Sequence, residues 1–283
     1  MPRYEPLIPE LRLNPEREVE RVTEFIRRVF EEAGRDTAVI GLSGGVDSAT
    51  ALGLTVEALG EDRVVALILP ERDTPESDVK DAVRTAERFG VEYHVHDVTR
   101  VLEAFGAGSY VPCRPFSRDA DANLKARVRM CVLYYFANEL GGLVVGTGNR
   151  TEWLTGYFTL HGDGACDLAP LRHLYKTQVY LMADHLGVPR RIVEEKEPSA
   201  RLWPGQTDVE ELGIDYPRLD AILYALVDEG LSPEEAVSWL RERGVEVSGR
   251  EVEETRRRLL SSSFKRRIPP SPDVPEPEDP FLP

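Results

Sequence analysis

The run Ser43-Gly44-Gly45-Val46-Asp47-Ser48 is the segment of this chain best suited to chemistry. It follows an apolar stretch at 39–42, which predicts a buried strand, and it opens the apolar-periodic stretch 46–59, which predicts a helix. A tight strand-to-helix loop presents backbone N–H groups and the positive end of a helix dipole to one point, which suits a phosphate. The two glycines let the backbone approach an anion closely.

Asp47 adds the requirement for a cation. A carboxylate beside bound phosphates repels them unless a cation lies between, so Asp47 implies Mg²⁺. The loop has neither the Gly-Lys-Ser/Thr of a Walker A motif nor the Gly-x-Gly-x-x-Gly of dinucleotide-binding folds. An ordinary glycine-containing connection is the alternative interpretation. The full pattern resembles the pyrophosphate-binding loop of ATP-pyrophosphatases, which split ATP between its α and β phosphates, and this resemblance implies an ATP site.

The elements around this loop alternate between strands and helices. The predicted strands lie near 37–42, 63–69, 91–97 and 143–147. The predicted helices lie near 14–33, 47–59, 75–89, 119–140, 175–186, 215–229, 233–243 and 249–262. This order predicts an α/β fold, a Rossmann-like doubly wound parallel sheet of about five strands flanked by helices, with ligands at the carboxyl edge.

Domain organisation and composition narrow the class of protein. We expect one domain over residues 1–268, an irregular loop at 105–118, and an extended or disordered Pro-rich, acidic tail at 269–283. The formal charge of −15 argues against nucleic acid as a partner. Three scattered cysteines suggest neither zinc nor a disulfide framework. With no apolar leader and no membrane-length apolar run, we expect a soluble cytoplasmic protein with no membrane partner.

A second group of polar residues follows the strand predicted at 143–147. Gly146-Thr147-Gly148-Asn149-Arg150-Thr151-Glu152 places a hydroxyl and a carboxylate just beyond a strand end. Glu152 could complete a Mg²⁺ site with Asp47, since Mg²⁺ takes one or two carboxylates together with phosphates and water. The alternative is that Glu152 caps or decorates a helix. Further motifs follow in order: Gly162-Asp163-Gly164, Tyr175-Lys176-Thr177, Gly205-Gln206-Thr207-Asp208 and Glu211-Leu212-Gly213.

Together these motifs make the chain resemble ammonia-dependent NAD synthetases over nearly all of residues 15–268. That family converts deamido-NAD (nicotinic acid adenine dinucleotide), ATP and ammonia to NAD, AMP and pyrophosphate. The resemblance implies that Asp47, Glu152 and Lys176 carry catalysis and that Asp47 and Glu152 hold Mg²⁺. It implies that ATP is bound by Gly41, Leu42, Ser43, Gly44, Gly45, Val46, Asp47, Ser48, Thr147, Lys176 and Ser199. It implies that the deamido-NAD acceptor is contacted by Arg127, Leu160, Asp167, Phe264 and Lys265.

The chain departs from the family pattern on the acceptor side. Leu160 stands where many members have a lysine that contacts the acceptor, and Phe264-Lys265 stands where many have His-Lys. A cation is lost at position 160, and His161 replaces only a fraction of its charge near neutral pH. Ser199 replaces a threonine and keeps the hydroxyl. Without the resemblance, Arg127 and Arg129 would be interpreted as solvated charges on a helix, and Lys176 as a surface residue in the first turn of a helix.

The family mechanism transfers AMP to the nicotinate carboxylate, after which ammonia displaces AMP, so no Ser or Cys nucleophile is needed. We expect free ammonia as the nitrogen donor, because there is no room for an added glutaminase domain and no cysteine has the context of one. The family also implies a homodimer packed through the helix at 119–140, whose apolar residues exceed one covered face; a fully buried helix is the alternative. Two other functions stay open: another ATP-pyrophosphatase with a different acceptor, and a nucleotide-binding protein without turnover.

Overall fold

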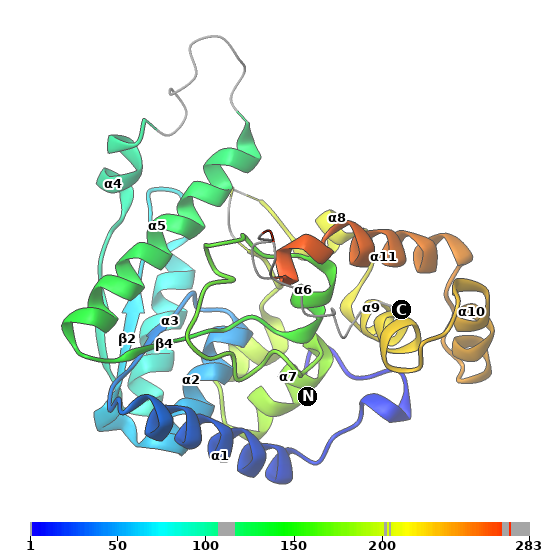
Figure 1. Ribbon diagram of the computed structural model, residues 1–283, viewed down its shortest axis with the longest axis horizontal. Helices are drawn as coiled ribbons and strands as arrows, with labels where there is room; N and C mark the ends of the chain where they lie inside the picture. The colour runs from blue at the N-terminus through cyan, green and yellow to red at the C-terminus, as the bar shows by residue number, and fades with distance from the viewer. Residues whose placement is uncertain (1, 107–116, 201–202, 204, 268–271, 273–283) are drawn as a thin grey trace.

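A four-stranded parallel sheet forms the centre of the protein (Figure 1). The computed structural model describes residues 2–106, 117–200, 203, 205–267 and 272. The strands are β1 (Ala38–Gly41), β2 (Val64–Ile68), β3 (Glu92–Val95) and β4 (Leu143–Val145), and their order is β3-β2-β1-β4. The predicted parallel α/β fold is confirmed. The prediction of about five strands is one too high for the described residues, because the chain beside β4 forms only an isolated parallel bridge, Val145 to Leu168.

Helices cover both faces of this sheet (Figure 1). On one face lie α1 (Pro15–Ala33), α2 (Val46–Leu59), α3 (Glu76–Phe89) and α7 (Lys176–His185). On the other face lie α4 (Thr99–Ala104) and α5 (Arg118–Glu139). Successive β1 residues alternate between the faces: Ala38 and Ile40 pack with the first group, and Val39 packs with the second. Both faces of β1 are therefore buried, which explains its uninterrupted apolar sequence.

The C-terminal helices pack around an apolar cluster of their own, seen beside the sheet in Figure 1. They are α6 (Arg150–Thr155), α8 (Asp208–Leu212), α9 (Tyr216–Leu223), α10 (Pro233–Glu242) and α11 (Gly249–Ser261). The helix predicted at 215–229 changes from α-helix to a π-helical turn at Tyr224–Asp228. A second π-helical turn spans Arg191–Glu195, and 3-10 turns span Pro9–Leu11, Glu61–Arg63 and Ser263–Arg266.

Helix boundaries follow local capping chemistry. The Asn14 side chain accepts a hydrogen bond from the Arg17 N–H, Pro15 occupies the first helical position, and Gly34 ends α1 at φ +61°. Ser248 and Glu251 form a reciprocal capping box at the start of α11. These signals explain why the long helices match their predicted ranges. The short helices α4, α6 and α8 were not predicted, because five or six residues carry too little periodicity.

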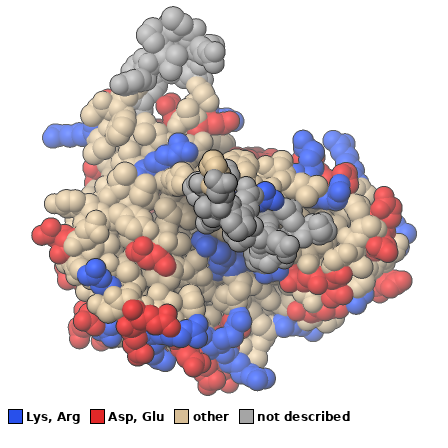
Figure 2. Space-filling model, in the orientation of Figure 1, with Lys and Arg blue, Asp and Glu red and all other residues tan. Residues whose placement is uncertain are grey.

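On the face shown in Figure 2, acidic side chains gather below, over α1, and at the right, over α10, with basic ones interspersed. The described residues on this face form no continuous basic strip. No helix among the described residues is long and apolar enough to cross a membrane. Cys131 and Cys166 are free thiols. Cys113, most of the loop predicted at 105–118, and nearly all of the tail predicted at 269–283 lie outside the described residues.

Candidate active site

The loop after β1 is held in shape by its own hydroxyl groups. The Gly45 N–H donates to Ser43 Oγ at 3.2 Å, and the Ser43 N–H donates to Ser48 Oγ at 3.3 Å. Ser48 Oγ in turn donates to the Gly45 carbonyl at 3.1 Å. Gly45 is the N-cap of α2 and its side chain is only hydrogen, so the first turn of this 14-residue helix lacks a side-chain cap. An uncapped helix start beside a glycine loop is suited to an anionic ligand.

Gly44 is the position where this loop requires glycine. Its φ is +75°, and a Cβ there would overlap the backbone carbonyl of Asp78 on α3. The Gly44 carbonyl accepts a hydrogen bond from Lys196 Nζ at 2.8 Å. Lys196 also pairs with Asp78 at 2.7 Å and with Asp81 at 3.1 Å. Lys196 therefore ties the loop to α3, a connection that the sequence reasoning missed.

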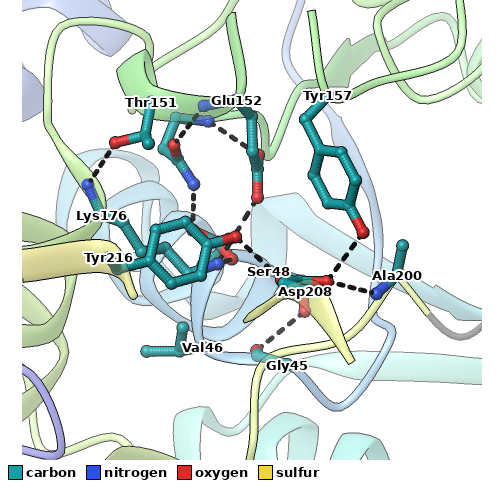
Figure 3. A network of polar contacts seen from close by, with 12 residues as sticks. Gly45, Val46, Ser48, Thr151, Glu152, Tyr157, Lys176, Ala200, Asp208 and Tyr216 are labelled. Carbon is teal, nitrogen blue, oxygen red and sulfur yellow. Dashed lines mark hydrogen bonds and ion pairs between the residues drawn. The ribbon is translucent and has the colours of Figure 1, made fainter. Parts of the chain in front are cut away.

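Asp47, Glu152 and Lys176 come from three separate elements and meet at one point. Lys176 Nζ forms a short ion pair with Asp47 and lies 3.4 Å from Glu152 Oε1. Figure 3 shows Glu152 of α6 and Lys176 of α7 directed toward each other. The Lys176 residue is buried and its ammonium lies 5.0 Å from the centre of the Tyr216 ring. The structure thus brings together the three side chains predicted to carry catalysis.

The electrostatics of this group favour the binding of a further cation. Burial, followed by the negative charge of Asp47, raises the pKa of Glu152 to about 8. Burial alone would lower the pKa of Lys176, but the nearby carboxylates outweigh it and raise that pKa well above its usual value. Lys176 therefore balances one carboxylate, and a further cation is needed for Asp47 and Glu152 to be ionised together near neutral pH. Two carboxylates with room for phosphate oxygens are a suitable donor set for Mg²⁺, so the residues fit this ion.

Asn149 joins the two carboxylates through a capping box. Its side chain accepts from the Glu152 N–H at 3.0 Å, and Glu152 Oε2 accepts from the Asn149 N–H at 3.2 Å. Asn149 Nδ2 also donates to Asp47 Oδ1 at 2.8 Å. Glu152 therefore caps α6, as its alternative interpretation held, and it also lies close enough to Asp47 for the two charges to interact. The Asn-x-x-Glu spacing was the available signal for Asn149.

A second polar network lies beside the first and is centred on buried Asp208 (Figure 3). Its carboxylate accepts hydrogen bonds from Tyr157 at 3.0 Å and from Tyr216 at 2.8 Å. It also accepts from the Ala200 N–H at 3.1 Å, which fixes the segment next to Ser199. Sequence reasoning did not assign a role to Asp208, although it lies within the Gly-Gln-Thr-Asp motif.

Asp220 fixes the starts of α6 and α7, and this residue, too, has no role assigned from the sequence. Its carboxylate accepts from Thr151 Oγ1 at 2.6 Å and from the Thr177 N–H at 2.8 Å. Thr151 Oγ1 also accepts from the Lys176 N–H at 2.9 Å. Asp220 is fully buried, and burial raises its pKa to about 6.

A cavity of about 440 Å³ opens above these groups at the carboxyl edge of the sheet. The predicted ATP residues lie along its wall, apart from Gly44, whose carbonyl is held by Lys196. These lining residues are Gly41, Leu42, Ser43, Gly45, Val46, Asp47, Ser48, Thr147, Lys176 and Ser199. Such a position matches the ligand-binding edge of open α/β sheets.

The predicted acceptor residues are less closely assembled. Lys265 lines the cavity and donates to the carbonyls of Gly156 and Phe158, each at 2.7 Å. Arg127 is exposed and its Nε donates to the Leu160 carbonyl at 3.3 Å. The cavity wall does not include Arg127, Leu160, Asp167 or Phe264.

Asp167 is hydrogen-bonded to β4 and α5. Its carboxylate accepts from the Val144 N–H at 2.7 Å and from Tyr134 at 3.2 Å. Phe264 lies on the surface with 62% of its area exposed. The roles of these residues toward an acceptor stay predictions.

The parallel sheet, the phosphate loop and the acidic pair define a nucleotide-binding α/β enzyme. The NAD synthase family model matches residues 18–269. The NH₃-dependent NAD⁺ synthetase of Methanopyrus kandleri is 75% identical over 100% of this chain and 99% of its own length. The chain therefore belongs to the NAD synthase family.

Solved structures agree with this assignment. An NMN synthetase from Francisella tularensis superposes with a TM-score of 0.79 at 32% identity, covering 93% of this chain and 100% of its own. The NH₃-dependent NAD synthetase of Campylobacter jejuni, in complex with nitrate, gives a TM-score of 0.75 at 27% identity, covering 92% and 99%.

Proposed function

We propose that this enzyme makes NAD from deamido-NAD, ATP and ammonia, releasing AMP and pyrophosphate. The observation that carries the proposal is the convergence of Asp47, Glu152 and Lys176 beside the phosphate loop. The Methanopyrus kandleri relative, named an NH₃-dependent NAD⁺ synthetase, supports both the product and the nitrogen donor.

In the first step, an oxygen of the nicotinate carboxylate attacks the α-phosphorus of ATP. The bond from that phosphorus to the bridging oxygen of pyrophosphate breaks, which gives an acyl-adenylate. The N–H groups of the loop at 43–48 and the ammonium of Lys176 stabilise the charge that develops on the phosphate oxygens. Lys176 suits this role because its backbone is fixed by Thr151 and its side chain by two carboxylates.

Asp47 and Glu152 are the residues that would hold Mg²⁺. A magnesium ion bound there supplies neutralisation of phosphate charge. Burial and the charge of Asp47 favour the neutral form of Glu152 in the absence of a metal ion, and a cation bound between the two carboxylates would favour its ionised form. Lys176 then remains available to the phosphates.

In the second step, ammonia attacks the acyl carbon and AMP leaves with the oxygen that joined it to the acyl group. The nitrogen loses a proton as the amide forms, and solvent or a second ammonia accepts it. The contribution of the chain is to hold the two reactants in contact and to exclude water from the acyl-adenylate.

We also infer a homodimer formed through α5. This helix leaves 65% of Tyr135 exposed, and 43% of Leu140, the residue that follows its last turn, is exposed as well. Sedimentation at micromolar concentration tests the inference: a mass of about twice 31.8 kDa is expected, and a monomer contradicts it.

A direct assay tests the proposed function. Purified protein is mixed with Mg-ATP, ammonium and deamido-NAD, and NAD, AMP and pyrophosphate are quantified. Equal amounts of the three products are expected. Pyrophosphate release that is independent of deamido-NAD would support another acceptor, and nucleotide binding without products would support a protein without turnover.

One comparison favours a second acceptor, the mononucleotide. The Francisella tularensis structure is that of an NMN synthetase, and it has the higher TM-score and identity of the two structures described. The same assay with nicotinate mononucleotide decides between the acceptors. A higher kcat/KM with deamido-NAD supports the first proposal, and a higher kcat/KM with the mononucleotide overturns it.

A further inference from the structure

Arg129 lies in the middle of α5 and forms part of the cavity wall, yet no site motif accounts for it. Its Nε donates to the Leu69 carbonyl at 3.0 Å, just beyond the end of β2. This bond fixes the plane of the guanidinium group. The four remaining N–H hydrogens of the guanidinium lie on the two terminal nitrogens.

The charge of Arg129 has no ion-pair partner among the residues that the structure describes. Glu71, a nearby carboxylate, is paired with Lys125 at 2.7 Å. Asp163, the other nearby carboxylate, accepts from the Thr159 N–H at 2.9 Å. Burial lowers the pKa of Arg129, although arginine keeps its proton at any physiological pH. A partly buried, unpaired cation is costly unless an anion joins it.

We propose that Arg129 is a substrate-binding residue whose free guanidinium edge binds a phosphate of a nucleotide in the cavity. The planar guanidinium can donate two parallel hydrogen bonds to phosphate oxygens. This inference rests on the proposed function, which supplies two phosphate-bearing ligands, ATP and deamido-NAD. Leu69 follows β2, which lies next to β1, and β1 leads into the phosphate loop. Arg129 is therefore held near the predicted ATP phosphates, and ATP is the expected partner.

Equilibrium binding measurements test the assignment without requiring turnover. Dissociation constants for ATP, deamido-NAD and adenosine are measured on wild-type protein, Arg129→Met and Arg129→Lys. Arg190→Met is the matched control, since that side chain is 83% exposed and, among the described residues, forms an ion pair only with Glu194, four positions along the chain. Arg129→Met is expected to weaken ATP binding roughly 10- to 100-fold, as for other hydrogen bonds to charged groups. Adenosine binding and the control should change less than about twofold, within the scatter of exposed surface changes.

Arg129→Lys keeps the charge and should lose several-fold less affinity than Arg129→Met. If Arg129→Met does not fold, a lysine variant with unchanged affinity for both nucleotides overturns the proposal. Weakened deamido-NAD binding with unchanged ATP binding retains the phosphate role and reassigns the ligand. Equal weakening of ATP and adenosine contradicts it, because Arg129 would then shape the wall. A wild-type enzyme that makes no NAD would refute the proposed function alone.

Discussion

The two sides of the cavity differ in how fully the protein assembles them. On the phosphate side, Lys176 forms ion pairs with both Asp47 and Glu152. On the acceptor side, Asp167 is bonded to the backbone of β4 and Phe264 is exposed. The first side is thus a preorganised charge cluster, whereas the second consists of separate groups without a common focus. The residues proposed for catalysis are therefore fixed by contacts with one another, whereas the residues predicted to contact the acceptor are not.

The strongest test of the preorganised side is Asp47→Asn. The change removes one of the two converging carboxylates and leaves Lys176 with one charged partner. We expect kcat to fall roughly 10²- to 10³-fold, the usual loss for a group that stabilises transition-state charge. Asp62→Asn, an exposed aspartate in the turn before β2, is the control. Steady-state rates at saturating substrates provide the measurement, and an unchanged kcat would remove Asp47 from the mechanism.

Asp220, which fixes the starts of α6 and α7, should make the stability of the protein depend on pH. Because the folded-state pKa of Asp220 is about 6, above its unfolded value, the folded protein binds more protons between about pH 4 and 6. Above about pH 6 the buried, ionised carboxylate therefore lowers the free energy of unfolding by its full amount. This destabilisation decreases as the pH falls toward about 4 and the carboxylate becomes protonated. Relative to Asp220→Asn, the wild type should gain up to about 3 kcal/mol over that range. Denaturant unfolding at several pH values measures this difference, and a constant offset would contradict it.

A substitution of Lys196 tests whether ATP binding requires the link between the phosphate loop and α3. Lys196→Met removes the bonds to the Gly44 carbonyl, Asp78 and Asp81. We expect the KM for ATP to rise roughly tenfold with a smaller change in kcat, because a charged hydrogen bond orients the loop. Lys80→Met is the control, since that lysine lies on α3, is 59% exposed and has Glu76 as its one ion-pair partner in the described part of the chain. A fall in kcat without a change in KM would show that Lys196 does not act through ATP binding.

The acceptor side should respond most weakly. Leu160→Lys restores the cation found in many family members and should lower the KM for deamido-NAD roughly two- to fivefold, as expected for a partly screened charge pair. Leu7→Lys, at a residue 45% exposed, controls for the added charge. Initial rates at varied deamido-NAD are the measurement. A raised KM would mean that this side is arranged for a side chain without charge.

Local signals were enough to predict much of the fold. The Asn14-Pro15 start of α1, the buried strand before the phosphate loop and the glycine-rich loop all act over a few residues. The proximity of Asp47 and Glu152 also followed, because the two residues come a few positions after neighbouring parallel strands.

Contacts between distant segments were not predictable in this way. Lys176 lies 129 residues from Asp47 along the chain, and Lys196 lies 152 residues from Gly44. No periodicity specifies which carboxylate such a lysine meets. Asp167 shows the converse, since its motif suggested a ligand contact while its carboxylate completes hydrogen bonds to β4 and α5. Buried polar groups are satisfied by tertiary packing, which a single sequence does not reveal.

An oxygen-isotope transfer experiment follows the proposed adenylation step itself. Deamido-NAD labelled with ¹⁸O in the nicotinate carboxylate is turned over with Mg-ATP and ammonium, and the products are analysed by mass spectrometry. If the carboxylate attacks the α-phosphorus beside Asp47, Glu152 and Lys176, each AMP formed carries one ¹⁸O atom. Label in pyrophosphate, or AMP without label, would contradict the adenylation that the site is proposed to perform.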